Sequence, residues 1–206
     1  MRACGEEFAA MDRRRGRGHA RAFLAGYLTR DVAPLLRRTY TDPVSRELFQ
    51  AAAELTGMVA FTAYDTGDHG AAQRARIQAL RLAKAAGDRG YGAHTLANLA
   101  TQAIYLELPG EAVRLARAAV NAAGPHPAVT ARLLTTQANA HALAGDHHSF
   151  RTTINRATTA MDPRRPTRPT GLDRLLHRAP PCRNRHAVTP GPRPARPCAH
   201  LRSPSP

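Results

Sequence analysis

The chain has 206 residues and no tryptophan, and aromatic side chains make up only 5% of it. Alanine and leucine supply most of its apolar positions instead. Such a composition suits helices that pack closely together better than it suits a β-sandwich. We therefore expect an all-α fold.

Cysteines and long apolar runs are also scarce. Cys4, Cys182 and Cys198 are too few and too scattered for a disulfide framework. No stretch approaches the run of about 18 apolar residues that a transmembrane helix needs, and the first residues lack the apolar core of a signal peptide. These absences predict a cytoplasmic, reduced protein with no membrane partner.

Motifs of catalysis are missing as well. The sequence contains no nucleophile elbow, no P-loop and no dinucleotide fingerprint. The carboxylate pairs Glu6–Glu7 and Glu107–Glu111 have no pocket signal around them. We expect a protein that is not an enzyme and that needs no cofactor.

What the chain does have is a repeat. Gly67, Ala72 and Ala79 recur 40 residues later as Glu107, Ala112 and Ala119, and 38 residues after that as Gly145, Phe150 and Ala157. Each copy consists of an apolar helix, a tight turn and a second apolar helix. A repeat of this length is typical of a helix-hairpin solenoid, whose units bury their apolar faces against their neighbours.

The expected turns share a chemistry. Gly67–Asp68, Gly87–Asp88 and Gly145–Asp146 each place glycine at a helix end, where a left-handed conformation closes the last turn, and aspartate where it can cap the next helix. Pro109 and Pro127 open helices of the second and third repeats. Asp42–Pro43 predicts a helix running to about Asp65, with Asp42 as a candidate cap.

The net charge of +15 is unevenly distributed. Residues 1–46 carry +5, residues 47–162 carry +1 and residues 163–206 carry +9. The repeats are therefore almost neutral, and the basic character belongs to the two ends. The basic run at residues 13–21 could contact phosphates, but a solvated helix end is the preferred interpretation.

Residues 163–206 differ from the rest of the chain. They contain eleven of the sixteen prolines and ten arginines. Such a segment buries too little apolar surface to offset the entropy of ordering, so we predict a disordered tail. A frameshift in a GC-rich gene would give the same composition, and both explanations stay open.

Two groups of residues have the chemistry of metal ligands without the right setting. His141 precedes His147 and His148 by six and seven residues across a turn, which does not match the spacing of ligands on one helix. The second group lies in the tail and has no apolar residues to pack around a metal. It comprises Cys182, His186, Cys198 and His200. We predict no metal site.

Six short stretches carry a likeness to a known family: residues 18–21, 33–36, 63–67, 78–83, 85–89 and 110–113. Through these stretches, residues 8–160 resemble the tetratricopeptide-repeat (TPR) sensory halves of actinobacterial Xre-type helix-turn-helix transcriptional regulators. The resemblance implies a TPR-like right-handed solenoid that binds a protein or peptide. No Xre-type helix-turn-helix motif is visible in this sequence, so we expect the DNA-binding domain to be lost or encoded elsewhere.

In such solenoids the first helix of each hairpin faces the concave groove, which gives a set of candidate binding residues. Tyrosine and arginine suit the anchoring of a peptide, although Phe61 and Tyr105 would serve equally well as core between repeats. The basic and amide clamp of chaperone-binding TPR domains is not reproduced by Arg132 and Asn139. The groove candidates are Phe61, Tyr64, His94, Thr101, Tyr105, Arg132, Thr135 and Asn139.

Together these features predict a TPR-like repeat domain over residues 1–162, with N-terminal helices in 1–46, three hairpin repeats in 47–162 and the tail in 163–206. The expected function is protein or peptide interaction, as the regulatory part of a transcriptional regulator. The alternatives are a peptide-pheromone sensor and a basic nucleic-acid-binding protein. A second copy of the chain is a further candidate partner, and the arginine-rich tail predicts weak, non-specific contact with nucleic acid.

Overall fold

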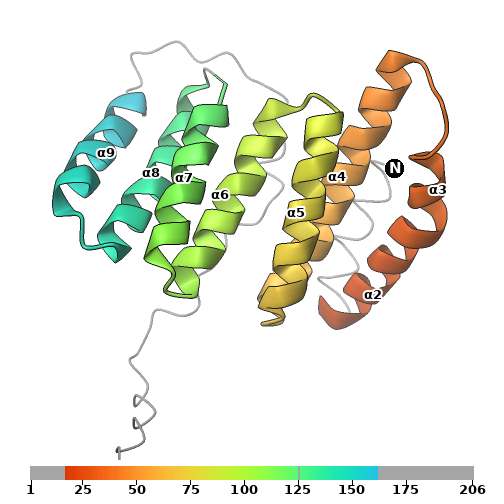
Figure 1. Cartoon of the computed structure of the whole chain (residues 1–206), viewed down its shortest axis with the longest axis horizontal. Helices are drawn as coiled ribbons and strands as arrows, with labels where there is room; N and C mark the ends of the chain where they lie inside the picture. Colours follow the sequence, from red (N-terminus) through yellow and green to blue (C-terminus); the bar gives the residue numbers. More distant parts are fainter. Residues whose placement is uncertain (1–16, 125, 162–206) are drawn as a thin grey trace, which may run out of the picture.

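The computed structural model describes residues 17–124 and 126–161, and within them every regular element is a helix. The helices follow one another in a row, so that the chain runs across Figure 1 from α2 to α9. The elements are α2 (Arg17–Tyr27), the π-helical turn η1 (Leu28–Val32), α3 (Ala33–Leu35), α4 (Asp42–Asp65), α5 (His69–Ala85), α6 (Arg89–Tyr105), α7 (Pro109–Ala122), α8 (Pro127–Leu143) and α9 (His147–Ala160).

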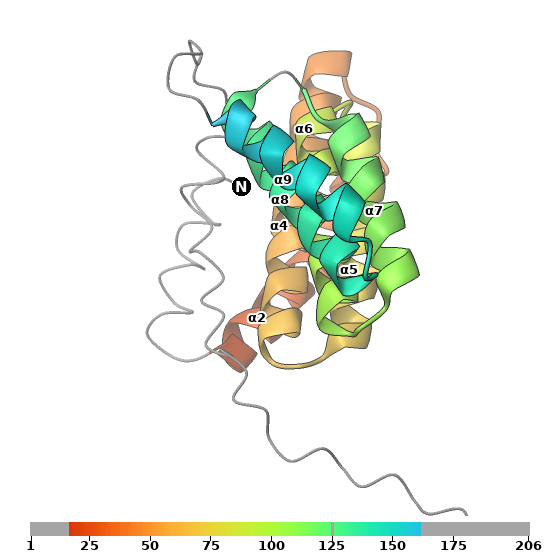
Figure 2. The same ribbon diagram turned by 90° about the vertical axis from the view of Figure 1, so that its left-hand side faces the viewer.

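Consecutive helices pack as antiparallel pairs. The most extensive contacts join α4 to α5, α6 to α7 and α8 to α9. Successive pairs then meet through α5 with α6 and through α7 with α8, and α6 also lies against α8. Figure 2, which looks along the row from the end where α9 lies, shows α7 on the opposite side from α4 and α8. The prediction of an all-α fold built from helix pairs is confirmed.

A short irregular stretch precedes the pairs. Pro34 has no N–H to give to the preceding turn, and the helix widens before it into η1, where Ala33 N–H reaches the carbonyl of Leu28. Val32 is buried there, and α2 packs against α4. Around Pro34 the chain therefore forms a π turn followed by the single turn α3.

The glycine–aspartate turns form as predicted. Gly67, Gly87 and Gly145 have φ values of 80°, 70° and 72°. At the first turn, the amide of residue 68 donates to the carbonyl of residue 63 and the amide of residue 67 to that of residue 64, the two bonds of a Schellman motif. Each aspartate then caps the next helix, accepting from the amides of Ala71, Tyr91 and Ser149.

The turn between α6 and α7 reaches the same geometry without glycine. Glu107 has a φ of 56°, and the amides of Glu107 and Leu108 donate to the carbonyls of Ile104 and Ala103. A left-handed conformation costs a residue with a side chain about 1–2 kcal/mol. The packing of α6 on α7 therefore imposes the turn on an unfavourable residue.

Alanine occupies fully buried positions of the paired helices, as the repeat predicts. Ala72, Ala79, Ala112 and Ala119 have no exposed surface, and Ala157 is 4% exposed. Small side chains at these positions let the two helices of a pair approach closely. The apolar interior is consequently a series of small clusters between neighbouring helices.

One local prediction is wrong. Asp42 does not cap α4, because Thr41 is the N-cap residue and neither side chain provides a capping bond. Asp42 and Pro43 instead occupy the first two helical positions, where a carboxylate and a missing N–H are both well tolerated. The predicted tail at 163–206 and residues 13–16 of the basic run lie outside the described residues, and the domain boundaries remain predictions.

Candidate functional site

A stripe of polar and aromatic residues runs along one side of α6. His94, Asn98, Thr101 and Tyr105 follow one another at intervals of four, three and four residues, which places them on one face of the helix. We call these four residues the α6 stripe. Its two ends make contacts with different neighbouring helices.

At the N-terminal end of the stripe, three side chains form a polar cluster across α6 and α8. Arg132 Nη1 lies 2.8 Å from His94 Nδ1, and Arg132 Nη2 donates to Asn98 Oδ1 at 3.3 Å. Asn98 Nδ2 lies 3.0 Å from His94 Nε2. We refer to His94, Asn98 and Arg132 as the polar cluster.

The histidine of the polar cluster is held neutral. Burial, with Arg132 and Arg76 nearby, lowers the pKa of His94 to about 4. A guanidinium group can only donate hydrogen bonds, so Nδ1 of the neutral His94 ring accepts from Arg132 and Nε2 carries the proton. The contact between Nε2 and Asn98 Nδ2 therefore brings two N–H donors together and is not a hydrogen bond.

At the C-terminal end of the stripe, Tyr105 joins an aromatic cluster with α4 and α5. The rings of Tyr64 and Tyr105 meet edge to face with centroids 5.9 Å apart. The ring of His69 lies 5.4 Å from Tyr64 and 5.1 Å from Tyr105. Tyr105 remains 53% exposed, so this aromatic cluster of Tyr64, His69 and Tyr105 reaches the surface.

A buried arginine, Arg76, packs against the aromatic cluster. The guanidinium of Arg76 lies 4.8 Å from the centre of the Tyr64 ring, a cation–π geometry, although the residue is only 7% exposed. Arg76 also donates to Oε1 of Gln102, and Nε2 of Gln102 donates to the backbone carbonyl of His69 at 2.7 Å. These bonds fix the N-terminus of α5 against α6.

The structure thus brings the predicted groove residues together in two pairs, His94 with Arg132 and Tyr64 with Tyr105. Thr101 and Thr135 are exposed on α6 and α8, and their hydroxyls donate to the carbonyls of Ala97 and Ala131 in their own helices. Asn139 is exposed on α8 and Phe61 is half-buried on α4. Whether any of the eight binds a ligand stays a prediction.

Sequence reasoning missed several residues of the two clusters. Asn98 could have been found, because it lies one helical turn from His94 on the same face. Arg76 could not, because it sits between Ala72 and Ala79 on the buried side of α5, where an arginine is rarely expected. His69 and Gln102 act through contacts between different helices, which spacing along the chain does not reveal.

In the described part of the chain, no three histidine, cysteine, aspartate or glutamate side chains come together as a metal site. His141 is buried, with Nδ1 3.7 Å from a carboxylate oxygen of Asp146, whereas His147 and His148 are exposed. The candidate ligands Cys182, His186, Cys198 and His200 lie outside the described residues. No helix among residues 17–124 and 126–161 is both long and apolar enough to cross a bilayer.

We compared the chain with protein-family models, with curated proteins and with solved structures, and none of the three comparisons gives a match.

Proposed function

We propose that this chain is a TPR-like, right-handed helical-repeat module that binds a protein or peptide segment and serves as the regulatory part of a bacterial transcriptional regulator. The helix pairs, the repeated Schellman turns and the alanine contacts support the repeat architecture. Binding without catalysis is the usual role of such arrays, and no catalytic constellation was found in the sequence.

The observation that carries the proposal is the α6 stripe with its two clusters. From His94 to Tyr105 the stripe rises about 16 Å along the helix axis, which an extended peptide covers with about five residues. The polar cluster offers amide and guanidinium donors at one end, and the aromatic cluster offers an exposed ring at the other. This arrangement suits main-chain or carboxylate oxygens at Asn98 and Arg132 and an apolar side chain at Tyr105.

The electrostatics of the neighbouring helices agree with an oxygen-rich ligand. Neither α6 nor α8 contains an aspartate or a glutamate. A bound carbonyl or carboxylate would therefore meet donors without competing acids from these helices. A peptide pheromone is a special case of such a ligand.

A displayed library of random peptides, selected on the full chain, tests the proposal. Peptides that enrich should bind Asn98→Ala and Tyr105→Ala at least about tenfold more weakly, a loss of about 1.4 kcal/mol. Asn121→Ala on α7 is the matched control, because Asn121 is exposed and lies outside the stripe. Failure to enrich any peptide, or equal binding by all variants, would contradict the groove.

The regulatory part of the proposal needs a different observation. An in-frame helix-turn-helix encoded in the neighbouring DNA would support it, and a neighbouring sequence that encodes no DNA-binding domain would speak against it. A salt titration against random and promoter DNA addresses the nucleic-acid alternative. Sequence-selective, salt-resistant binding of the chain would replace the interaction module by a DNA-reading protein.

A further inference from the structure

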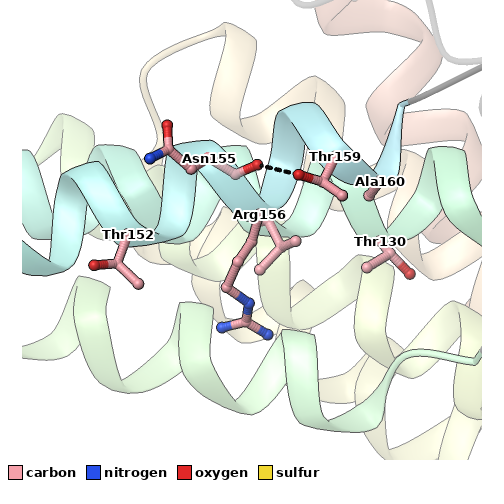
Figure 3. Close-up of a pocket in the computed structure, with 7 residues that line it drawn as sticks. Thr130, Thr152, Asn155, Arg156, Thr159 and Ala160 are labelled. Atoms are coloured by element: carbon pink, nitrogen blue, oxygen red, sulfur yellow. Dashed lines mark hydrogen bonds between the residues drawn. The ribbon is translucent and has the colours of Figure 1, made fainter.

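The last helix pair has a hollow on its outer side. The hollow has a volume of about 550 Å³ and lies between α8 and α9 (Figure 3). Thr152 and Arg156 extend from the same side of α9, whereas Asn155 points away along its edge. The lining residues are Thr130 and Leu134 from α8 and Thr152, Asn155, Arg156, Thr159 and Ala160 from α9.

The preceding repeat shows which structural element packs at the equivalent position. Leu134 and Ala160 correspond to Leu96 and Ala122, 38 residues earlier in the sequence. In the preceding pair, Leu96 and Ala122 pack against a cluster that α8 joins through Val129 and Leu133. The hollow is therefore the place that a helix occupies one repeat earlier.

A second hollow extends the first along α9. It has a volume of about 420 Å³ and shares Thr152 and Asn155 with the first hollow. The two form one trough, with an apolar floor at Leu134 and Ala160 at one end and polar walls at the other. The other residues that line the second hollow are His147, His148 and Arg151.

The trough is cationic. Neither α8 nor α9 contains an aspartate or a glutamate. Arg151 and Arg156 are exposed and form no ion pair with any of residues 17–124 or 126–161. The neighbouring acid, Asp146, accepts the amide of Ser149 as the helix cap. A second copy of the chain, docked trough to trough, would bring like charges together.

We propose that the trough binds an acidic amphipathic helix of a partner protein. Small and branched apolar residues of that helix pack on Leu134 and Ala160, as Val129 and Leu133 of α8 do in the preceding pair, and its carboxylates face Arg151 and Arg156. The apolar floor favours a helix over a nucleic-acid backbone, because phosphates gain nothing from apolar contact. This site is separate from the α6 stripe and does not depend on it.

The probe is a synthetic peptide based on the sequence of α8 itself. The first peptide has the sequence of residues 127–143, with the positions on either side of Val129 and Leu133 replaced by glutamate. A second peptide has glutamine at the same positions. Fluorescence anisotropy with the full chain should show binding of the glutamate peptide. The double variant Arg151→Glu/Arg156→Glu should weaken this binding at least about tenfold.

Two further variants separate the trough from general charge. Arg74→Glu/Arg81→Glu makes the same charge change on exposed positions of α5 and should leave binding unchanged. Thr159→Trp fills the hollow without changing charge and should weaken binding about as much as the double variant in α9.

Any of three results would overturn the proposal. The first is equal affinity of the chain for the glutamate and glutamine peptides. The second is a loss of affinity in Arg74→Glu/Arg81→Glu as large as in Arg151→Glu/Arg156→Glu, and the third is unchanged binding by Thr159→Trp. Binding of random duplex DNA that disappears with Arg151→Glu/Arg156→Glu but persists in the α5 variant, without peptide binding, would assign the surface to nucleic acid instead.

Discussion

Helix α6 is the first helix of its pair, and it contacts the first helices of the two adjacent pairs, α4 and α8, in different ways. Toward α4, Tyr91 extends over Gly57, so closely that a Cβ on Gly57 would lie 2.0 Å from the tyrosine oxygen. Toward α8, the polar cluster lies beside an apolar contact of Ala93, Ala97 and Leu133. The α4–α6 junction thus depends on the fit of aromatic rings, with Tyr91 over Gly57 and Tyr105 against Tyr64. The α6–α8 junction combines small apolar contacts with hydrogen bonds between charged and neutral groups.

Each junction also contains a titratable side chain, and burial shifts the pKa values of the two in opposite directions. Burial raises the pKa of Tyr91 above its usual value, with Glu54 and Asp88 adding to the effect. Burial and two arginines lower the pKa of His94. Both groups are therefore neutral in the folded protein, and the comparison predicts that the α6–α8 junction fails in acid and the α4–α6 junction in alkali.

The largest expected effect is acid destabilisation through His94. Its pKa is about 4 in the fold against 6.5 for an unperturbed histidine, so between these values the unfolded chain binds more protons. The stabilising contribution is complete above pH 6.5 and is lost as the pH falls toward 4, by on the order of 3 kcal/mol. Urea unfolding at several pH values measures this loss.

His94→Gln is the control for the acid effect, because glutamine does not titrate. The variant should keep a nearly flat stability between pH 6.5 and 4. Asp68 and Asp146 also have lowered pKa values, but the stability they contribute is lost only below about pH 3.8. A wild-type chain whose stability does not change between pH 6.5 and 4 would show that His94 is not held neutral.

The α4–α6 junction should respond to alkali instead. The pKa of Tyr91 is raised above 10.0, so the unfolded chain releases this proton first as the pH rises. Stability should therefore fall above pH 10 by up to about 1.4 kcal/mol per pH unit. Tyr91→Phe should remove this fall, whereas Tyr105→Phe, at an exposed ring, should keep it. Loss of the alkaline slope in both variants would rule out an origin at Tyr91.

A steric change at Gly57 isolates the shape requirement of the same junction. Gly57→Ala places a methyl group against the oxygen of Tyr91, and overpacking of this kind costs about 1–3 kcal/mol. Adding Tyr91→Phe removes that oxygen and should restore part of the loss, since the next ring atom lies 3.3 Å from the new Cβ.

Gly92→Ala is the matched control for this steric change, because its Cβ would meet only Leu80 at 3.7 Å. Replacing a helical glycine by alanine at such a site gains about 0.5–1 kcal/mol. Thermal melts of the wild type, Gly57→Ala, Tyr91→Phe and the double variant complete a double-mutant cycle, and Gly92→Ala is measured beside it. Equal stability changes at Gly57 and Gly92 would mean that Tyr91 does not fill the space above Gly57.

The turns and the small side chains inside the helix pairs could be predicted from the sequence. The repeat of alanines and the glycine–aspartate turns follow from local rules, and the structure has both as predicted. His94 and Arg132 could be assigned to one surface from their positions in the repeat. Their separation of 2.8 Å could not, because it depends on the tilt between α6 and α8.

The α4–α6 junction was harder to predict for a physical reason. Gly57 breaks no rule visible along the chain, and its role appears only when Tyr91 of another helix extends over it. Glu107 is a similar case, since nothing local favours its positive φ. Contacts between distant segments override residue preference at both places.

The smallest expected effect concerns the exposed edge of the α4–α6 junction. Tyr105→Ala removes the edge-to-face contact with Tyr64 and the contact with His69, and aromatic pairs of this kind contribute about 0.5–1.5 kcal/mol beyond their buried area. Because Tyr105 is 53% exposed, we expect the free energy of unfolding to fall by only about 1 kcal/mol in total. The losses of stability in acid and in alkali should not change. Tyr105→Phe keeps the ring contacts and should melt like the wild type. A loss above about 3 kcal/mol in the alanine variant, the size seen for buried rings, would show that Tyr105 is core between repeats and could not be spared for a ligand.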